Sequence, residues 1–397
     1  MSADFSVASA PAFLAGNCLC LLNSGGEYFP ALIAEIDAAV HEVHLETYIF
    51  ADDAIGRLVA AALARTAQRG VAVRVLVDGF GAREFAAGLG VELEASGVEV
   101  MTYRPEVGKT GFRRHRLRRL HRKLSVFDGR IAFVGGINVI DDFDDGRSES
   151  ARFDYAVRIE GPLVPRIHSA MRHVWRLVRW ARLGRRPPAP AALPVMPVVS
   201  GTIKAALLVR DNLRHRRDIE NAYLAAIHSA RQEILISNAY FLPGRHFRKA
   251  LLAAAKRGVR VKLLLQGRVE NVLQHYATQS LYDRMLSVGV RVFEYEKAFL
   301  HAKVAVIDSD WATVGSSNID PFSLLLSREA NVVVRDAAFA QQLRASLDDA
   351  ITGSAREVRA EDQRRRSWLA RLGSAVAYSL VRFLIGVTRY GGKQYSD

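Results

Sequence analysis

The chain alternates between short apolar runs and segments whose apolar residues recur at helical spacing. In the first half, residues 28–40 and 55–69 carry apolar side chains three or four positions apart, which predicts two amphipathic helices. Residues 44–50 and 71–78 predict strands, and a third strand begins at 97–101. The run 71–78 is almost continuously apolar, as expected for a strand buried on both faces. This alternation predicts an α/β fold.

The second half of the chain repeats this order. A helix is predicted over 219–230, and strands are predicted over 234–241, 258–265 and 289–292. In each half we expect helices on both faces of a mostly parallel sheet, with one hairpin. An internal repeat within 397 residues indicates two copies of one unit. We place the first domain at 1–186, a proline-rich linker at 187–197, the second domain at 198–360 and a basic and apolar C-terminal segment at 361–397.

A polar motif recurs at the same place in both halves. Its members are His121, Lys123, Asp128 and Asn138, matched 180 residues later (301 − 121) by His301, Lys303, Asp308 and Asn318. Side chains two positions apart on a strand share a face, so each copy offers an imidazole beside an ammonium. Both aspartates count as catalytic candidates, although Gly129 after Asp128 favours a hairpin turn over a substrate contact. Each asparagine follows the return strand, where a short amide can close on an anion.

Paired histidines and lysines suit a two-step displacement at phosphorus. One imidazole attacks and becomes phosphorylated, while the other donates a proton to the leaving oxygen and then accepts one from the incoming acceptor. The lysines supply positive charge to the nonbridging oxygens, so neither a metal nor another cofactor is expected. The plain alternative is a pair of structural His-x-Lys strands left by a duplication.

The amino-acid composition predicts an anionic partner and a reducing compartment. The net charge is +14 and the isoelectric point is near 10.0, which predicts binding to nucleic acid or to an acidic membrane surface. Cys18 and Cys20 are the two cysteines and form no CxxC pair, which indicates a reducing compartment without a structural metal. Residues 1–22 lack the pattern of a secretion signal, and no uncharged apolar run reaches the roughly 18 residues of a spanning helix.

Three segments break the repeat and concentrate positive charge. The first, before His121, is either a solvated loop or a rim that collects phosphate groups; it contains Arg104, Lys109, Arg113, Arg114, Arg116, Arg118 and Arg119 against the acid Glu106. The second, 171–186, has an arginine stripe and two tryptophans, typical of an interfacial helix or of a domain-packing helix. The third, 361–397, favours an in-plane anchor on an anionic membrane over a helix packed on the domain.

The doubled HxKxxxxD motif, followed by GGxN or GSSN, resembles the phospholipase D superfamily over most of the chain. The resemblance implies two α/β/α sandwich domains related by a pseudo-twofold duplication, with one active site at their interface. It also implies a covalent phosphohistidine at His121, with His301 as the general acid and base.

In this superfamily an acidic residue downstream of each motif orients the histidine. The resemblance assigns Glu329 to the second motif, and it assigns Asp154, in preference to Glu149, to the first. Ser316 stands where the first motif has Gly136, so a hydroxyl that contacts phosphate is expected from one half only.

Within the superfamily, residues 154–162 and 315–323 resemble bacterial cardiolipin synthases of the class without two N-terminal membrane helices. This implies phosphatidyl transfer from one phosphatidylglycerol to another, giving cardiolipin and glycerol, by a peripheral protein on the cytoplasmic side of the cell membrane. The alternative is a phosphodiesterase that hydrolyses phospholipid or nucleic acid. The apolar C-terminal segment and the doubled motif argue against nucleic acid as a partner, and the intact motifs argue against an inactive lipid-binding scaffold.

Overall fold

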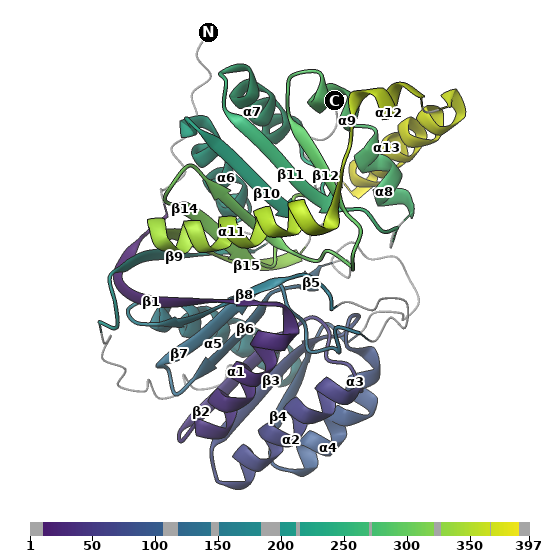
Figure 1. Ribbon diagram of the computed structural model, residues 1–397. Helices are drawn as coiled ribbons and strands as arrows, with labels where there is room; N and C mark the ends of the chain where they lie inside the picture. Colours follow the sequence, from purple (N-terminus) through teal and green to yellow (C-terminus); the bar gives the residue numbers. More distant parts are fainter. Residues whose placement is uncertain are drawn as a thin grey trace.

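The computed structural model of the protein describes residues 11–105, 118–143, 151–183, 199–211, 215–269, 272–320, 327–365 and 367–388 (Figure 1). The first half contains β1 (Leu14–Asn23), α1 (Ser24–Ala38), β2 (Glu42–Thr47), α2 (Ala54–Gln68), β3 (Ala72–Asp78), α3 (Arg83–Ala87), α4 (Leu89–Ala95), β4 (Glu99–Tyr103), β5 (Arg119–Leu120), β6 (Lys123–Phe127), β7 (Ile131–Gly135), β8 (Tyr155–Glu160) and α5 (Val164–Leu183).

The second half contains β9 (Ile203–Arg210), α6 (Asp218–Ser229), β10 (Glu233–Asn238), α7 (Arg245–Lys256), β11 (Arg260–Gln266), α8 (Val272–Gln279), α9 (Tyr282–Leu286), β12 (Arg291–Tyr295), β13 (Lys303–Ile307), β14 (Trp311–Gly315), β15 (Ser327–Arg335), α11 (Ala337–Ser354), β16 (Ala355–Glu357), α12 (Ala360–Arg365) and α13 (Trp368–Thr388). The linker, Glu149 and most of the basic segment before His121 lie outside the described residues.

One continuous sheet runs through both halves. Its strand order is β1-β8-β7-β6-β2-β3-β4 in the first half and β9-β15-β14-β13-β10-β11-β12 in the second, with β16 at the end. The two orders correspond strand for strand, and β1 pairs antiparallel with β9 where the halves meet. The halves are therefore related by an approximate twofold axis, as the internal repeat predicted.

The prediction of a mostly parallel sheet is wrong. Within each half only three neighbouring strands run parallel, β2-β3-β4 and β10-β11-β12. The motif strands β6 and β7, like β13 and β14, form antiparallel hairpins, as Asp128-Gly129 indicated for the first half. Strands β1 and β9 were not predicted, because their sequences lack a clear alternation of apolar and polar residues.

A shared hydrophobic core fixes the two halves against each other. Helices α1, α2 and α4 cover one core of the first half, and α6 and α7 cover the matching core of the second. A third core combines side chains from both halves, among them Val126 and Ile167 from the first and Val306 and Leu343 from the second. Each such aliphatic side chain contributes about 1.5–3 kcal/mol when it is fully buried. The interface is thus as firmly packed as a domain interior, with α11 lying across the middle of the molecule (Figure 1).

The C-terminal helix α13 has two different faces. Ala377 and Val381 are buried in the second-half core, and α13 lies beside α8. The other face exposes a row of large apolar side chains at intervals of four and three residues: Trp368, Leu372, Val376, Leu380 and Phe383. Among the helices of the described ranges, none combines the length and the apolar character needed to cross a bilayer. The helix therefore packs on the domain along one side and leaves an apolar stripe on the other.

Candidate active site

Each motif histidine is held by a strand from the opposite half of the chain. His121 and His301 lie just before β6 and β13, rather than within a strand as predicted. The backbone N–H of His121 donates to the carbonyl of Arg328 on β15 (3.0 Å), and that of His301 donates to the carbonyl of Phe153, just before β8 (2.8 Å). The two halves therefore exchange backbone hydrogen bonds at the point where the histidines enter the site.

The carboxylates cross the interface in the same way. His121 Nδ1 lies 3.1 Å from Glu329 Oε1, and His301 Nδ1 lies 2.6 Å from Asp154 Oδ2. The assignment of Glu329 to the second motif and Asp154 to the first is therefore wrong. The acids do flank the motifs along the chain, but the twofold arrangement turns each of them towards the histidine of the other half. Neither half alone contains an oriented histidine.

The lysines stay beside their own histidines, as the two-residue spacing predicted. Lys123 Nζ donates to the carbonyl of His121 (2.7 Å), and Lys303 Nζ donates to the carbonyl of His301. Lys303 Nζ also lies 3.8 Å from Asp154 Oδ2. Burial, helped by the neighbouring Lys303 and opposed by Glu329, lowers the pKa of Lys123 to about 7. A bound phosphodiester would oppose this effect, because an anion stabilises the ammonium form.

Burial also shifts the pKa values of the groups that exchange protons. It lowers the pKa of both His121 and His301, and the adjacent lysines lower these pKa values further. Burial raises the pKa of Asp154 to about 6, against the opposing influence of Lys303. Burial and the lysines therefore favour neutral imidazoles, whereas the negative charge of an anionic substrate would favour an imidazolium.

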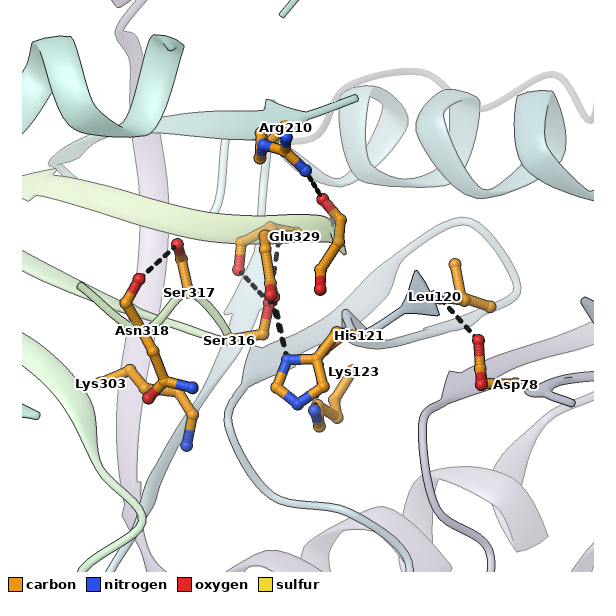
Figure 2. A network of polar contacts seen from close by, with 12 residues as sticks. Asp78, Leu120, His121, Lys123, Arg210, Lys303, Ser316, Ser317, Asn318 and Glu329 are labelled. Atoms are coloured by element: carbon orange, nitrogen blue, oxygen red, sulfur yellow. Dashed lines mark hydrogen bonds and ion pairs between the residues drawn. The ribbon is translucent and has the colours of Figure 1, made fainter. Parts of the chain in front are cut away.

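The two carboxylates are supported differently. The Ser316 hydroxyl donates to Glu329 Oε2 (2.5 Å; Figure 2), and the buried Arg210 donates to the carbonyl of Ser327, two residues before Glu329. In the first half, a Cβ at Gly136 would lie only 2.4 Å from Asp154 Oδ1, so glycine makes room for that carboxylate. The Ser316 hydroxyl, expected to contact phosphate, thus orients Glu329 instead, and the exchange of glycine for serine accompanies the exchange of aspartate for glutamate.

The motif aspartates are turn residues at a distance from the histidines. Asp128 has a φ of 50° and accepts hydrogen bonds from the backbone N–H groups of Val40, His41 and Glu42 (3.0, 2.7 and 2.8 Å). Asp308 also has a φ of 50° and accepts from three consecutive N–H groups, at 231–233. Six residues lie between each aspartate and its histidine, and five of these form a strand roughly 16 Å long. This geometry favours the hairpin-turn interpretation, and a catalytic role for either aspartate stays an untested prediction.

The motif asparagines are buried beside the site. Asn138 Oδ1 accepts the backbone N–H of Ile49 (3.1 Å), which fixes the orientation of its amide. Asn318 lies next to Lys303, on the same side of the site (Figure 2). Both asparagines stay candidates for contact with an anion.

Sequence reasoning missed two residues that shape the surroundings of His121. The Tyr48 ring lies 4.8 Å from the His121 ring, and Lys123 Nζ lies 5.4 Å from the centre of the Tyr48 ring. The buried carboxylate of Asp78 accepts the N–H of Leu120 (2.8 Å), directly before His121 (Figure 2). Asp78 ends the predicted strand 71–78 and Tyr48 lies near the end of the predicted strand 44–50, at the sheet edge where open α/β sheets bind their ligands. That position was the available signal.

A separate buried cluster has the composition of a metal site. Ligand atoms of Glu42, His44 and His168 lie within 4.8 Å of one another. However, Arg74 Nη1 lies 2.8 Å from His44 Nε2 and 3.4 Å from Glu42 Oε2. A guanidinium thus already balances the charge of Glu42, and the cluster is an ion-pair network rather than a convincing cation site.

Comparisons with known proteins match both halves of the chain. The family model described as "Cardiolipin synthase, PLD-like domain" matches residues 32–175 and 223–351. Cardiolipin synthase B of Escherichia coli is 40% identical over 377 residues, which cover 92% of this chain and 88% of that protein. A probable cardiolipin synthase of Bacillus subtilis is 31% identical, over 83% of this chain and 65% of that protein.

Among solved structures, phosphatidylserine synthase of Haemophilus influenzae shares the fold, with a TM-score of 0.66 at 14% identity and 96% coverage of both chains. The histidine, lysine and crossed carboxylate of each half belong to the two matched segments. The chain belongs to the cardiolipin synthase family of phospholipase D-like enzymes.

Proposed function

We propose that the protein transfers a phosphatidyl group from one phosphatidylglycerol molecule to another. His121 Nε2 attacks phosphorus, the bond from phosphorus to the glycerol oxygen breaks, and protonated His301 gives its proton to that oxygen. His301 then takes the proton of a hydroxyl on the second phosphatidylglycerol, whose oxygen displaces His121. The products are cardiolipin and glycerol, and both histidines return to their starting states.

The observation that carries this proposal is the pair of crossed histidine–carboxylate contacts at 3.1 and 2.6 Å. A carboxylate on Nδ1 fixes the ring and leaves Nε2 for the substrate, which is the arrangement that nucleophilic and acid–base roles both need. Lys123 and Lys303 supply charge to the nonbridging oxygens, and the amides of Asn138 and Asn318 are further candidate donors to them. No residue in this scheme calls for a metal or an organic cofactor.

The different supports favour His121 as the nucleophile. Its partner Glu329 accepts from the Ser316 hydroxyl and faces the buried Arg210 across paired strands, so its carboxylate is held in place by groups other than the histidine. Such a fixed anion stabilises the positive charge that a phosphorylated imidazole carries. Asp154, whose pKa burial raises to about 6, suits a partner histidine that gains and loses a proton in each cycle.

The substrate class implies contact with a membrane, and α13 supports a peripheral one. Its exposed apolar stripe, Trp368 to Phe383, lies on the face opposite Ala377 and Val381, which are buried. Together with a net charge of +14, this stripe suits in-plane binding to an anionic phospholipid surface on the cytoplasmic side of the cell membrane. Nucleic acid is not an expected partner.

The test is a product assay with labelled phosphatidylglycerol vesicles, using wild type, His121→Ala and, as a matched control, His228→Ala on the exposed surface of α6. We expect cardiolipin and glycerol in equal amounts from the wild type and the control, and neither from His121→Ala. Phosphatidic acid as the sole lipid product would make the protein a hydrolase. Cleavage of DNA without any lipid product would establish the nuclease alternative and end this proposal.

A further inference from the structure

A second concave site lies on the far side of the strand that carries Glu329. A cavity of about 640 Å³ opens between α4, β4 and the end of α5, and Arg328 of β15 reaches it from the other half of the chain. Leu177, Val178 and Ala181 of α5 line one wall. This volume is within the range of small-molecule sites, so a lipid head group and the start of an acyl chain can be accommodated.

The polar lining of this cavity is strongly basic. Arg104, Arg182 and Arg328 line it, and Glu94 is the one acid among the lining residues that the structure describes. Arg328 Nε lies 3.3 Å from the hydroxyl of Tyr103, and the Arg104 guanidinium lies 5.6 Å from the centre of the Tyr103 ring. Two guanidinium groups thus converge on one phenol at the edge of the cavity.

Two further observations indicate that this charge awaits an anion. Arg104 Nε is buried and has no hydrogen-bond partner among the described residues. Burial alone would raise the pKa of Tyr103, but Arg328 and Arg104 lower it by more, so the net shift is downward. A positive potential strong enough to outweigh burial attracts a phosphodiester, whose oxygens form charge-assisted hydrogen bonds with guanidinium groups.

The cavity is coupled to the catalytic site through β15. Arg328 lies between Ser327 and Glu329, and neighbouring side chains on a strand point to opposite faces. The carbonyl of Arg328 also accepts the backbone N–H of His121 (3.0 Å). An occupant bound to the Arg328 side chain would therefore be separated from the nucleophile by one strand.

We propose that this cavity docks the phosphodiester head group of an anionic phospholipid, with an acyl chain along the wall formed by Leu177, Val178 and Ala181. The proposal rests on the proposed function, for which it supplies a place to hold a second lipid beside the reacting one. The three arginines select the anionic head group, and the apolar wall favours a lipid over a free water-soluble phosphate. The site is distinct from the histidine–lysine centre, so it binds lipid without cleaving it.

The test uses a photoreactive phosphatidylglycerol in vesicles of phosphatidylcholine, followed by peptide mapping. The cavity variant is Arg104→Asn/Arg182→Gln, in which asparagine tolerates the φ of 53° at position 104. Arg328 is left intact because its backbone holds His121. The control, Arg176→Gln/Arg179→Gln, also removes two positive charges. Both positions are exposed on α5, the helix that carries Arg182, and neither lines the cavity. Thermal unfolding checks that both variants fold.

We expect labelling of the peptides that contain 99–105 and 176–183 in wild type and control, and about a tenfold loss of that labelling in the cavity variant. Excess dihexanoyl phosphatidylglycerol should compete, whereas deacylated glycerophosphoglycerol should not; competition by both would make the site one for free phosphodiesters. Equal labelling of the cavity and control variants would overturn the inference. Cardiolipin formation without cavity labelling would refute the docking site alone, and labelling without cardiolipin would refute the proposed function alone.

Discussion

Replacing Asp154 with asparagine tests whether the crossed contacts govern the chemistry. The side chain is 4% exposed and its Oδ2 lies 2.6 Å from His301 Nδ1, so the change removes a buried charge while preserving shape. A hydrogen bond to a charged group contributes about 1.5–3 kcal/mol, and so short a contact belongs at the upper end of that range. Since about 1.4 kcal/mol is a factor of ten in rate, we expect transfer from phosphatidylglycerol to fall by about 10²-fold.

The assay compares two leaving groups in the wild type and the variants Asp154→Asn, Glu329→Gln, His301→Ala and His121→Ala. Phosphatidylglycerol has a poor leaving group that needs a general acid, whereas phosphatidyl-p-nitrophenol has a good one that does not. In the burst of p-nitrophenolate, we expect Asp154→Asn and His301→Ala to recover to within about tenfold of wild type. Glu329→Gln and His121→Ala should stay slow with both substrates.

The decisive result is which carboxylate variant behaves like which histidine variant. Crossed contacts require that the Asp154 variant behave like the His301 variant, whichever histidine is the nucleophile. If Asp154→Asn instead behaved like His121→Ala, with Glu329→Gln recovering alongside His301→Ala, the contacts at 2.6 and 3.1 Å would not be the functional ones and the reasoning would be refuted.

Four further outcomes are expected. Asp128→Ala should lower the free energy of unfolding in urea by about 2 kcal/mol, because three backbone N–H groups lose their acceptor, with kcat changed less than about tenfold; a large loss of kcat at unchanged stability would return Asp128 to the chemistry. The pH profile of kcat/KM should be a narrow bell. Activity should fall as pH drops below about 6, because the Asp154 carboxylate, whose pKa is raised to about 6, becomes protonated. It should also fall as pH rises above about 7, because Lys123 loses its charge. An acid limb that persists in Asp154→Asn would contradict this assignment. Prolonged EDTA treatment should leave cardiolipin formation unchanged, since the motif lysines balance the phosphate charge; loss of activity that Zn²⁺ restores would contradict it. Leu372→Ser/Leu380→Ser should abolish most flotation with phosphatidylglycerol vesicles without a change in thermal stability, because both side chains are exposed; undiminished flotation would remove α13 from the membrane contact.

Much of the fold could be predicted because its signals are local. Helical spacing and continuous apolar runs marked α1, α2, β2 and β3 to within a few residues, and the repeated motif revealed the duplication. The strands outside the motif hairpin were not predictable in the same way. An apolar run is equally compatible with parallel and antiparallel neighbours, so the sequence did not indicate the antiparallel pairing of β8 with β7 or of β15 with β9.

The candidate site, too, could be predicted only where it depends on local sequence. The two-residue spacing placed each lysine beside its histidine, because both groups belong to one stretch of backbone. The carboxylates come from the other half, across 208 residues for His121 and Glu329, and no spacing along the chain encodes which half supplies them. A single sequence does not predict such contacts, because they depend on how the two halves pack together and not on the conformation of either half.

The two copies of the motif differ at paired positions around the crossed contacts. The glutamate that contacts one histidine accepts a hydrogen bond from Ser316, and the aspartate that contacts the other occupies space left by Gly136. Exchanging Gly136 for serine would force its Cβ against Asp154, so this serine fits the second half but not the first. The two halves therefore share a fold but hold their carboxylates with different groups. We infer that this difference allows one histidine to act as nucleophile and the other as general acid and base.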